Sequence, residues 1–487
     1  MSHSVPASAT FATLGVPSSL ITGLTKGGIT SPFPIQTATL PDTLAGRDVL
    51  GRGRTGSGKT LAFALPLVSR LARLVPSGDA LAGRSAPKRP RGLVLAPTRE
   101  LANQIVDTIE PLATAAGLTV MTIFGGVSQH RQVTQLRRGV DIVVATPGRL
   151  EDLMSQGEIR LDAVAITILD EADHMADLGF LPGVTRILAA TPGMGQRMLF
   201  SATLDSGVDK LVKRFLHQPL VHSVDGEESP VTAMTHHVFL VRDASHKRQI
   251  VHELASGSTR RLLFTRTKHQ ARKLARELTA DGIPAVELHG NLSQNARERG
   301  LQAFADGEVR VMVATDIAAR GIHVDDVDLV VHVDPPAEHK AYLHRSGRTA
   351  RAGNDGDVIT LVLPEQRADF HSMARAAKIT AMPAPVQSGD VRVKALVGTP
   401  AAPVTLVDAP SAASRVAAKA PAQAGRRSGG STPNRTRARQ EPTSQPSRSN
   451  TRGAAPATGT RDATVVRLSQ QSGHRRSSGR GRSKLSA

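Results

Sequence analysis

The sequence predicts an α/β fold in which two parallel-sheet domains follow one another. Two series of short apolar runs recur between longer helical stretches from about Asp48 to Leu363, and a polar, acidic segment at residues 220–234 separates them. The runs are continuous rather than alternating, which is typical of strands buried on both faces of a parallel sheet. Because parallel strands need crossover connections, runs that alternate with helical stretches indicate the α/β class.

Each series contains four clear runs, which predict strands at residues 92–97, 141–146, 163–170, 197–201, 261–265, 285–289, 309–315 and 328–334. The 487 residues suffice for two sizeable cores. We therefore expect a first domain at residues 1–218, a linker at 219–232 and a second domain at 233–380. Residues 381–487 contain mainly Ala, Pro, Ser, Gly and Arg. Such a segment buries too little apolar surface to fold, so a disordered Arg-rich tail is expected there.

The basic charge is concentrated in that tail. The chain has 61 Lys+Arg and 42 Asp+Glu, a net charge of +19. Residues 391–487 carry 18 basic and 3 acidic side chains, which leaves a nearly balanced body of 43 basic and 39 acidic ones. This asymmetry predicts a polyanionic partner, with the tail as a sequence-independent, salt-sensitive tether. The alternative is a solvated extension without a binding role.

Composition excludes several classes of protein. There is no Cys, which rules out disulfides, Cys-ligated zinc and thiol catalysis. Aromatic side chains are scarce, with no Trp and one Tyr, so a nucleic acid would be bound mainly through its phosphates rather than by base stacking. No window reaches eighteen uninterrupted apolar residues, and the first residues do not resemble a signal peptide. We expect a cytoplasmic protein without membrane contact.

A nucleotide site is indicated by the segment GRTGSGKT at residues 53–60, which follows a short strand and precedes a helical stretch. In that context the pattern predicts a P-loop, whose backbone N–H groups surround phosphates at a helix N-terminus. A Gly-rich turn matching by chance is the alternative. Lys59 is expected to reach the terminal phosphates, and Thr60 to bind Mg²⁺. The nucleotide-binding residues predicted here are Thr55, Gly56, Ser57, Gly58, Lys59 and Thr60.

A carboxylate pair follows about 110 residues later, where ILDEAD at residues 168–173 ends an apolar run. An Asp at the carboxyl end of a parallel strand lies where α/β sheets bind ligands. Asp170 is expected to hold Mg²⁺, directly or through water, and Glu171 to accept a proton from the attacking water. Acids that only cap the next helix are the alternative. Together with the P-loop, the pair predicts hydrolysis of a nucleotide.

At this point the sequence resembles the DEAD-box RNA helicases, over about residues 11–360. The tetrapeptide Asp170–Asp173 spells the family's name, and GITSPFPIQ at residues 28–36 is similar to its adenine-reading segment. The resemblance implies two tandem RecA-like domains. It also implies that Gln36 reads the adenine edge, for which an amide suits because it both donates and accepts. Phe11 is expected to contact adenine by its spacing, although a lone Phe is more often part of the core.

The remaining motifs occur in the family's order, and the resemblance implies their roles. Ser201 and Thr203 would couple hydrolysis to strand separation by hydrogen bonding to the carboxylate motif. Asp316 would touch the ATP ribose. His344, Arg348 and Arg351 belong to the catalytic motif of the second domain, in which the two arginines resemble arginine fingers. The implied RNA contacts are Arg99, Gly125, Gly126, Thr146, Arg149, Arg266, Thr315 and Arg320, of which Thr315 and Arg320 would lie near RNA or the domain interface.

The sequence departs from the family pattern at Gly53, Phe33, Ala350 and His323, and none of these removes a catalytic group. The resulting hypothesis is an RNA-stimulated ATPase that locally and non-processively unwinds short RNA duplexes or remodels RNA–protein complexes. Two alternatives stay open, a DNA-directed helicase and an RNA annealing or clamp protein that acts mainly through its tail. Structured or duplex RNA is the expected partner, bound through the core and the tail. Ribosomal precursors or the RNA decay machinery are further candidate partners.

Overall fold

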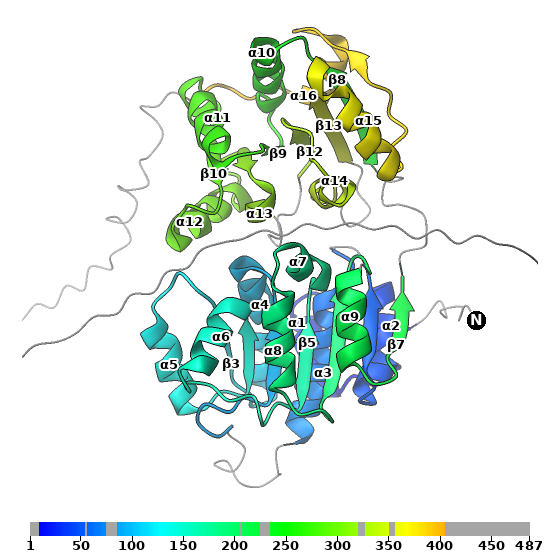
Figure 1. Cartoon of the computed structure of the whole chain (residues 1–487), viewed down its shortest axis with the longest axis vertical. Coiled ribbons are helices and arrows are strands. Elements are labelled where there is room, and N and C mark those ends of the chain that lie inside the picture. Colours follow the sequence, from blue (N-terminus) through cyan, green and yellow to red (C-terminus); the bar gives the residue numbers. More distant parts are fainter. Residues whose placement is uncertain are drawn as a thin grey trace, which may run out of the picture. The chain divides into compact units, whose positions relative to one another are not determined.

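The computed structural model describes residues 9–53, 56–74, 85–204, 206–224, 234–319, 327–349 and 356–404. Within them the chain forms two seven-stranded sheets, and every strand pairing in both sheets is parallel. Helices connect successive strands in each domain (Figure 1). The predicted α/β class with two tandem parallel sheets is therefore confirmed. Among the described residues, no helix has the length and apolar character needed to cross a membrane.

The first sheet has the strand order β3-β4-β2-β5-β6-β1-β7. Its strands are β1 (Val49–Arg52), β2 (Gly92–Leu95), β3 (Val120–Ile123), β4 (Ile142–Ala145), β5 (Ile166–Leu169), β6 (Gln196–Ser201) and β7 (Leu220–Ser223). The helices of this domain are α1 (Ser18–Lys26), α2 (Pro34–Leu44), α3 (Lys59–Arg73), α4 (Arg99–Ala115), α5 (Gln129–Arg138), α6 (Pro147–Ser155), α7 (Ala172–Asp177), α8 (Leu181–Ala189) and α9 (Ser206–Phe215).

The second sheet has the order β10-β11-β9-β12-β13-β8-β14. Its strands are β8 (Met234–Leu240), β9 (Arg261–Phe264), β10 (Ala285–Leu288), β11 (Val311–Ala314), β12 (Leu329–His332), β13 (Gly356–Val362) and β14 (Ala384–Pro385). The helices here are α10 (Ala244–Ala255), α11 (Lys268–Ala280), α12 (Gln294–Ala305), α13 (Asp316–Ala319), α14 (His339–Ser346), the 3₁₀ helix η2 (Pro364–Gln366), α15 (Arg367–Ala376) and α16 (Val391–Val397).

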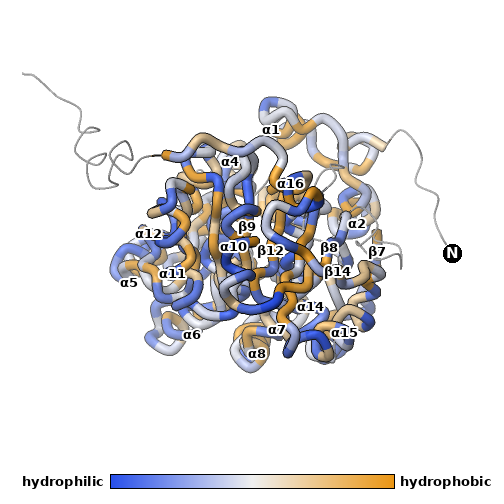
Figure 2. The backbone as a smooth tube through the Cα atoms, turned by 90° about the horizontal axis from the view of Figure 1, so that it is seen from above, coloured by the Kyte–Doolittle hydropathy of each residue, from blue (hydrophilic) through white to orange (hydrophobic). Residues whose placement is uncertain are grey.

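Each sheet is buried on both faces, as the continuous apolar runs predict. In β2, Val94 belongs to one hydrophobic cluster, whereas Leu93 and Leu95 belong to another. The same alternation divides β9, where Leu263 and Leu262 lie in different clusters of the second domain. Helices cover these faces, and Figure 2 shows hydrophobic and hydrophilic stretches alternating along α10, α11 and α12. All eight of the runs that predicted strands contain a strand.

Two predicted boundaries are wrong. The first is the linker at residues 219–232, because Leu220–Ser223 forms β7 and pairs with β1 in the first sheet. This edge strand has partly exposed residues at every position, which is why its sequence looks polar rather than core-forming. Residues 225–232 of the predicted linker lie outside the described residues.

The second wrong boundary is the end of the second domain, predicted at residue 380. β14 joins the second sheet beside β8, and α16 packs against α10 with Val393 and Val397 buried. The buried Arg261 donates from Nη2 to the Val397 carbonyl at 2.6 Å and so fixes the end of α16 to β9. The Asp390 side chain accepts from the Arg392 N–H and caps the helix. The expected disorder therefore fails for residues 381–404, and residues 405–487 lie outside the described part of the chain.

A chain that ends at Met382 should be less stable than one that ends at Val404. The shorter chain loses α16, so the apolar surface that Val393 and Val397 cover becomes exposed and Arg261 loses an acceptor. Burial of each Val contributes about 1.5 kcal/mol or more, so we expect the free energy of unfolding to fall by at least about 3 kcal/mol. Thermal and urea unfolding followed by circular dichroism would measure this. Equal stability of the two chains would contradict the packing role of α16.

Candidate functional site

The P-loop closes around its own lysine. Gly56 and Gly58 both have φ of 87°, which only glycine adopts without strain, and Gly58 is the N-cap of α3. Lys59 follows, is 6 % exposed, and donates from Nζ to the Gly53 carbonyl at 2.8 Å. Thr60 is the second residue of α3 and Ser57 lies between the two glycines. The strand–turn–helix geometry expected for a phosphate cradle is therefore present, while Thr55 lies outside the described residues.

Two carboxylates follow β5, of which Asp170 is buried and Glu171 is partly buried and faces this lysine. Glu171 Oε1 lies 3.1 Å from Lys59 Nζ, and Asp170 is 2 % exposed. Burial raises the pKa of Asp170 to about 7, and the neighbouring Glu171 charge adds to that rise. Burial also acts to raise the pKa of Glu171, but the Lys59 ammonium outweighs it and holds that pKa at about 2. Burial lowers the pKa of Lys59, and the surrounding carboxylates reverse this and raise it above its ordinary value.

Glu171 has a left-handed backbone, with φ of 52°, at the N-cap of α7. A non-glycine residue in this region is strained by about 1–3 kcal/mol, and such strain is concentrated at functional sites. The Glu171 N–H donates to Asp170 Oδ1 at 3.0 Å. The turn therefore fixes one carboxylate against the other and directs Glu171 toward Lys59. This arrangement goes beyond helix capping, because the Glu171 side chain makes no cap hydrogen bond.

The carboxylate motif is hydrogen-bonded to the end of β6, as the sequence predicts. Asp173 is 1 % exposed, and its Oδ2 accepts from both the N–H (2.9 Å) and the hydroxyl (2.8 Å) of Thr203. The Asp173 N–H donates to Ser201 Oγ at 3.2 Å, and Ser201 Oγ donates to the Thr203 carbonyl at 2.7 Å. The predicted hydrogen bonds are thus confirmed, and their role in coupling stays a prediction.

The segment expected to read adenine lies against the P-loop. Gln36 is fully buried; its Nε2 donates to the Gly58 carbonyl at 2.9 Å, and its Oε1 accepts from the Phe33 N–H at 2.9 Å. A Cβ on Gly58 would meet Gln36 at 2.6 Å and Phe33 at 2.9 Å. The unusual Phe33 is therefore a packing contact of the loop. Phe11 is 3 % exposed within the hydrophobic core of this domain, and its contact with adenine stays a prediction.

The RNA contacts predicted for the first domain come together at the carboxyl ends of three adjacent strands. Arg99 follows β2, Gly125 and Gly126 follow β3, and Thr146 and Arg149 follow β4. A Cβ on Gly126 would meet Arg99 Nη1 at 2.2 Å, so the guanidinium lies directly on this backbone. Burial is the main cause of a lowered pKa at Arg99. Two arginines beside exposed backbone amides suit phosphates.

In the second domain, Asp316 is held by an arginine. Arg345, 3 % exposed, forms a bidentate ion pair with Asp316 that includes an Nη2–Oδ2 distance of 2.8 Å. The same guanidinium donates to the Asp334 carbonyl at 2.7 Å and lies over the Phe264 ring. Thr315 directly follows β11, and its carbonyl accepts from the N–H groups of Ala318 and Ala319 in α13. The predicted ribose contact is thus positioned by a buried cation.

Asp334 joins three segments of the second domain. Its carboxylate accepts from Lys247 Nζ at 2.6 Å and from the Arg266 N–H at 3.0 Å, while its carbonyl accepts from Arg345. The predicted RNA contact Arg266 and the predicted ribose contact Asp316 are therefore attached to one buried carboxylate and one buried arginine. Sequence reasoning missed both attachments. An Asp at the carboxyl end of β12 repeats the signal that identified Asp170, and Arg345 lies inside the motif that contains His344.

The predicted catalytic residues of the second domain are only partly described. Arg348 is 5 % exposed, and its Nε donates to the His344 carbonyl at 3.3 Å. His344 lies in α14 and is partly buried. Arg351, Arg320 and the departures Ala350 and His323 lie outside the described residues. The roles of Arg348 and Arg351 as arginine fingers therefore stay predictions.

Comparison with known proteins agrees with this site. Residues 33–211 match the DEAD/DEAH box helicase family, and residues 246–353 match the helicase conserved C-terminal domain. The chain is 39 % identical over 332 residues to the ATP-dependent RNA helicase RhlB of Pseudomonas syringae, covering 67 % of this chain and 82 % of that protein. It is 42 % identical over 372 residues to the chloroplastic DEAD-box ATP-dependent RNA helicase 3A of Zea mays, covering 75 % of this chain and 48 % of that protein.

A solved structure of Saccharomyces cerevisiae Dbp5 bound to RNA and ADP BeF3 is also similar, with a TM-score of 0.69 and 26 % identity over 80 % of this chain and 100 % of that chain. These matches identify a parallel α/β helicase core of two RecA-like domains. The chain belongs to the DEAD-box family of ATP-dependent RNA helicases. It spans about half the length of the maize relative.

Replacing Thr203 by Val should destabilise the first domain. The substitution keeps the shape of the side chain but removes the hydroxyl that donates to the buried Asp173 carboxylate. A hydrogen bond to a buried charge contributes about 1.5–3 kcal/mol, so a loss of that size is expected in urea unfolding. Thr25→Val is the matched control, since the Thr25 hydroxyl bonds only within an exposed turn of α1. Equal effects of the two substitutions would contradict the inferred tie between β6 and the carboxylate motif.

Proposed function

We propose that this chain hydrolyses ATP when RNA is bound and uses the reaction to unwind short RNA duplexes locally or to remodel RNA–protein complexes. The observation that carries the proposal is the convergence of Lys59, Asp170 and Glu171 at one sheet edge. The hydrogen bonds that join Asp173 to Ser201 and Thr203, one donated by the Asp173 N–H to Ser201 and one donated by the Thr203 hydroxyl to Asp173, add a route from this site to β6. The names of the relatives, and an RNA- and ADP BeF3-bound neighbour, support the choice of RNA and ATP.

The ion pair between Lys59 and Glu171 suggests how ATP would prepare the site. Among the described residues, Lys59 Nζ donates to the Gly53 carbonyl and to Glu171 Oε1. Phosphate oxygens in the P-loop would compete for the same ammonium and draw it from Glu171. Glu171, once released from Lys59, would orient water and accept its proton. We infer that nucleotide binding replaces the Lys59–Glu171 ion pair by a pair between Lys59 and phosphate. Glu171 would then act as a base only when the P-loop holds a nucleotide.

The oxygen groups at this edge fit Mg²⁺. The Asp170 carboxylate and the Thr60 hydroxyl are the hard donors that this cation prefers, and Mg²⁺ usually combines one or two protein ligands with phosphate oxygens and water. When bound, Mg²⁺ would neutralise charge that develops on the phosphates. In the second domain, Arg345 would hold Asp316 for the ribose, and Arg348 and Arg351 would stabilise the transferring phosphoryl group.

Two wider predictions go with this proposal. We propose that residues 405–487, with 16 basic and 3 acidic side chains, bind RNA without sequence preference. Ribosomal precursors, the RNA decay machinery and a cytoplasmic location remain predictions from the sequence. A DNA-directed ATPase and an annealing or clamp protein remain the alternatives, and RNA-dependent ATP turnover separates them from the proposed helicase.

Lys59→Ala and Glu171→Gln test the proposed ATP site. Lys59→Ala removes the ammonium that would bind the phosphates and should reduce kcat by roughly 10²–10³-fold. Glu171→Gln removes the base and should reduce kcat by about 10²–10⁴-fold. Phosphate release with and without RNA is the measurement. Lys210→Ala and Glu110→Gln are matched controls on exposed helix faces and should keep full activity. Retained RNA-stimulated hydrolysis in both site variants would overturn the assignment, and equal stimulation by single-stranded DNA would favour the DNA alternative.

A chain that ends at Val404 tests the tail without disturbing α16. Removal of residues 405–487 takes away a net charge of +13, so RNA affinity should fall and its dependence on salt should flatten. The rate of ATP hydrolysis at saturating RNA should stay the same. Affinities measured by fluorescence anisotropy across a series of salt concentrations provide both values. Unchanged affinity and salt dependence would show that the tail is not a tether.

A further inference from the structure

A row of cations continues along α11 from the predicted RNA contact Arg266. The helix contains four Lys and Arg residues and one Glu. Three of the cations, Lys268, Arg272 and Arg276, are spaced four residues apart, which places them on one side of the helix. Successive members are about 6 Å apart along the axis. The row therefore offers separate cations to separate groups of an extended anionic ligand, starting two residues after Arg266.

Two of the acids near α11 are paired with cations outside the row. Glu277, the only acid of α11, lies 3.7 Å from Lys273 and 4.0 Å from Arg248 of α10. Asp281, just beyond the helix, pairs with His252 of α10. Within the described part of the chain, Lys268 and Arg276 are exposed and have no ion-pair or hydrogen-bond partner. Lys268 and Arg276 thus carry positive charge without an acidic partner, whereas Lys273 is paired with Glu277.

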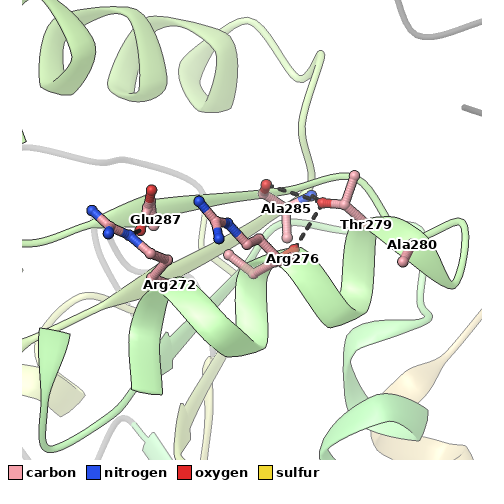
Figure 3. Close-up of a pocket in the computed structure, with 7 residues that line it drawn as sticks. Arg272, Arg276, Thr279, Ala280, Ala285 and Glu287 are labelled. Atoms are coloured by element: carbon pink, nitrogen blue, oxygen red, sulfur yellow. Dashed lines mark hydrogen bonds and ion pairs between the residues drawn. The ribbon is translucent and has the colours of Figure 1, made fainter. Parts of the chain in front are cut away.

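Arg272 and Arg276 also border a shallow pocket between α11 and the edge strand β10. The pocket has a volume of about 270 Å³, and small side chains, Ala275, Thr279, Ala280 and Ala285, form the rest of its lining with Glu287. Figure 3 shows both guanidinium groups on the β10 side of α11, with Arg272 joined to Glu287 and Arg276 without such a link. No aromatic ring lines the pocket, so it suits a phosphate group rather than a stacked base.

We propose that Lys268, Arg272 and Arg276 bind backbone phosphates of RNA that extends beyond the helicase core. The proposal rests on the proposed RNA-binding function, because Arg266 is the point at which the strand would reach α11. Continuity with Arg266, the uncompensated charge and the absence of stacking groups all favour a sequence-independent phosphate contact. Arg272 would exchange Glu287 for a phosphate, since that pair is 3.3 Å long and partly exposed.

The double substitution Lys268→Gln and Arg276→Gln tests the row. Each lost phosphate contact should lower the slope of log affinity against log salt by about 0.7 for single-stranded RNA, so the slope should fall by about 1.4. The loss should appear only with oligouridylates long enough to pass Arg266 and should be absent with shorter ones. Arg248→Gln with Lys273→Gln is the matched control, because it removes the same charge from two groups that are paired with Glu277.

The outcomes separate this inference from the proposed function. A length-dependent loss in the test variant and none in the control would support the row. Equal losses at every RNA length, or equal losses in both variants, would overturn it, as would unchanged binding of long RNA or tighter binding of an acidic polypeptide than of RNA. Failure of RNA to stimulate ATP hydrolysis by the unsubstituted chain would instead contradict the proposed function. Identical thermal unfolding of all variants is required for the comparison.

Discussion

The parallel pairing of every strand in both sheets is the constraint on which the site depends. Parallel strands have all their carboxyl ends at one edge, so the loops that carry chemistry must meet there. In the first sheet the central neighbours β5, β6 and β1 deliver Asp170, Ser201 and the P-loop to adjacent positions. The neighbours β3, β4 and β2 deliver the glycines and arginines of the predicted RNA contacts. Strand order alone therefore divides the edge into a half with the nucleotide motifs and a half with the predicted RNA contacts.

This edge holds charge that would be unfavourable elsewhere in the domain. Lys59, Asp170 and Asp173 are each less than a tenth exposed, and burial of unpaired ions costs several kcal/mol. The three are tolerated because each has partners: Glu171 for Lys59, a backbone N–H for Asp170, and Thr203 for Asp173. Such a network is stable only while its members are satisfied. A phosphate that displaced one partner would therefore change the contacts of the other members, so ligand binding would shift the residues of this network.

The sequence predicted those features that are local in the chain. Apolar runs gave the buried strands, and the P-loop and carboxylate motifs gave Lys59 and Asp170, because period and spacing are visible without a fold. It failed where distant residues meet. Arg261 contacts Val397 across 136 positions, and this contact makes α16 part of the second domain despite its Ala- and Pro-rich surroundings. Asp334 and Arg345 were missed for the same reason, because their contacts join segments that are distant in the sequence. β7 was missed because an edge strand is only half buried.

The distribution of charge separates three ways in which this chain can meet a polyanion. In the nucleotide site, the cation Lys59 is buried and paired. Replacing its protein partner by a phosphate therefore depends on geometry and has a high energetic cost. Along α11, Lys268 and Arg276 are exposed on a rigid helix and have no acidic partner among the described residues, which fixes their spacing but leaves them hydrated. In residues 405–487 they are numerous and nearly free of acids. Salt weakens contacts of hydrated charges most and buried pairs least. Affinity for RNA would then respond to ionic strength mainly through the tail and α11, while ATP turnover would depend on the buried network.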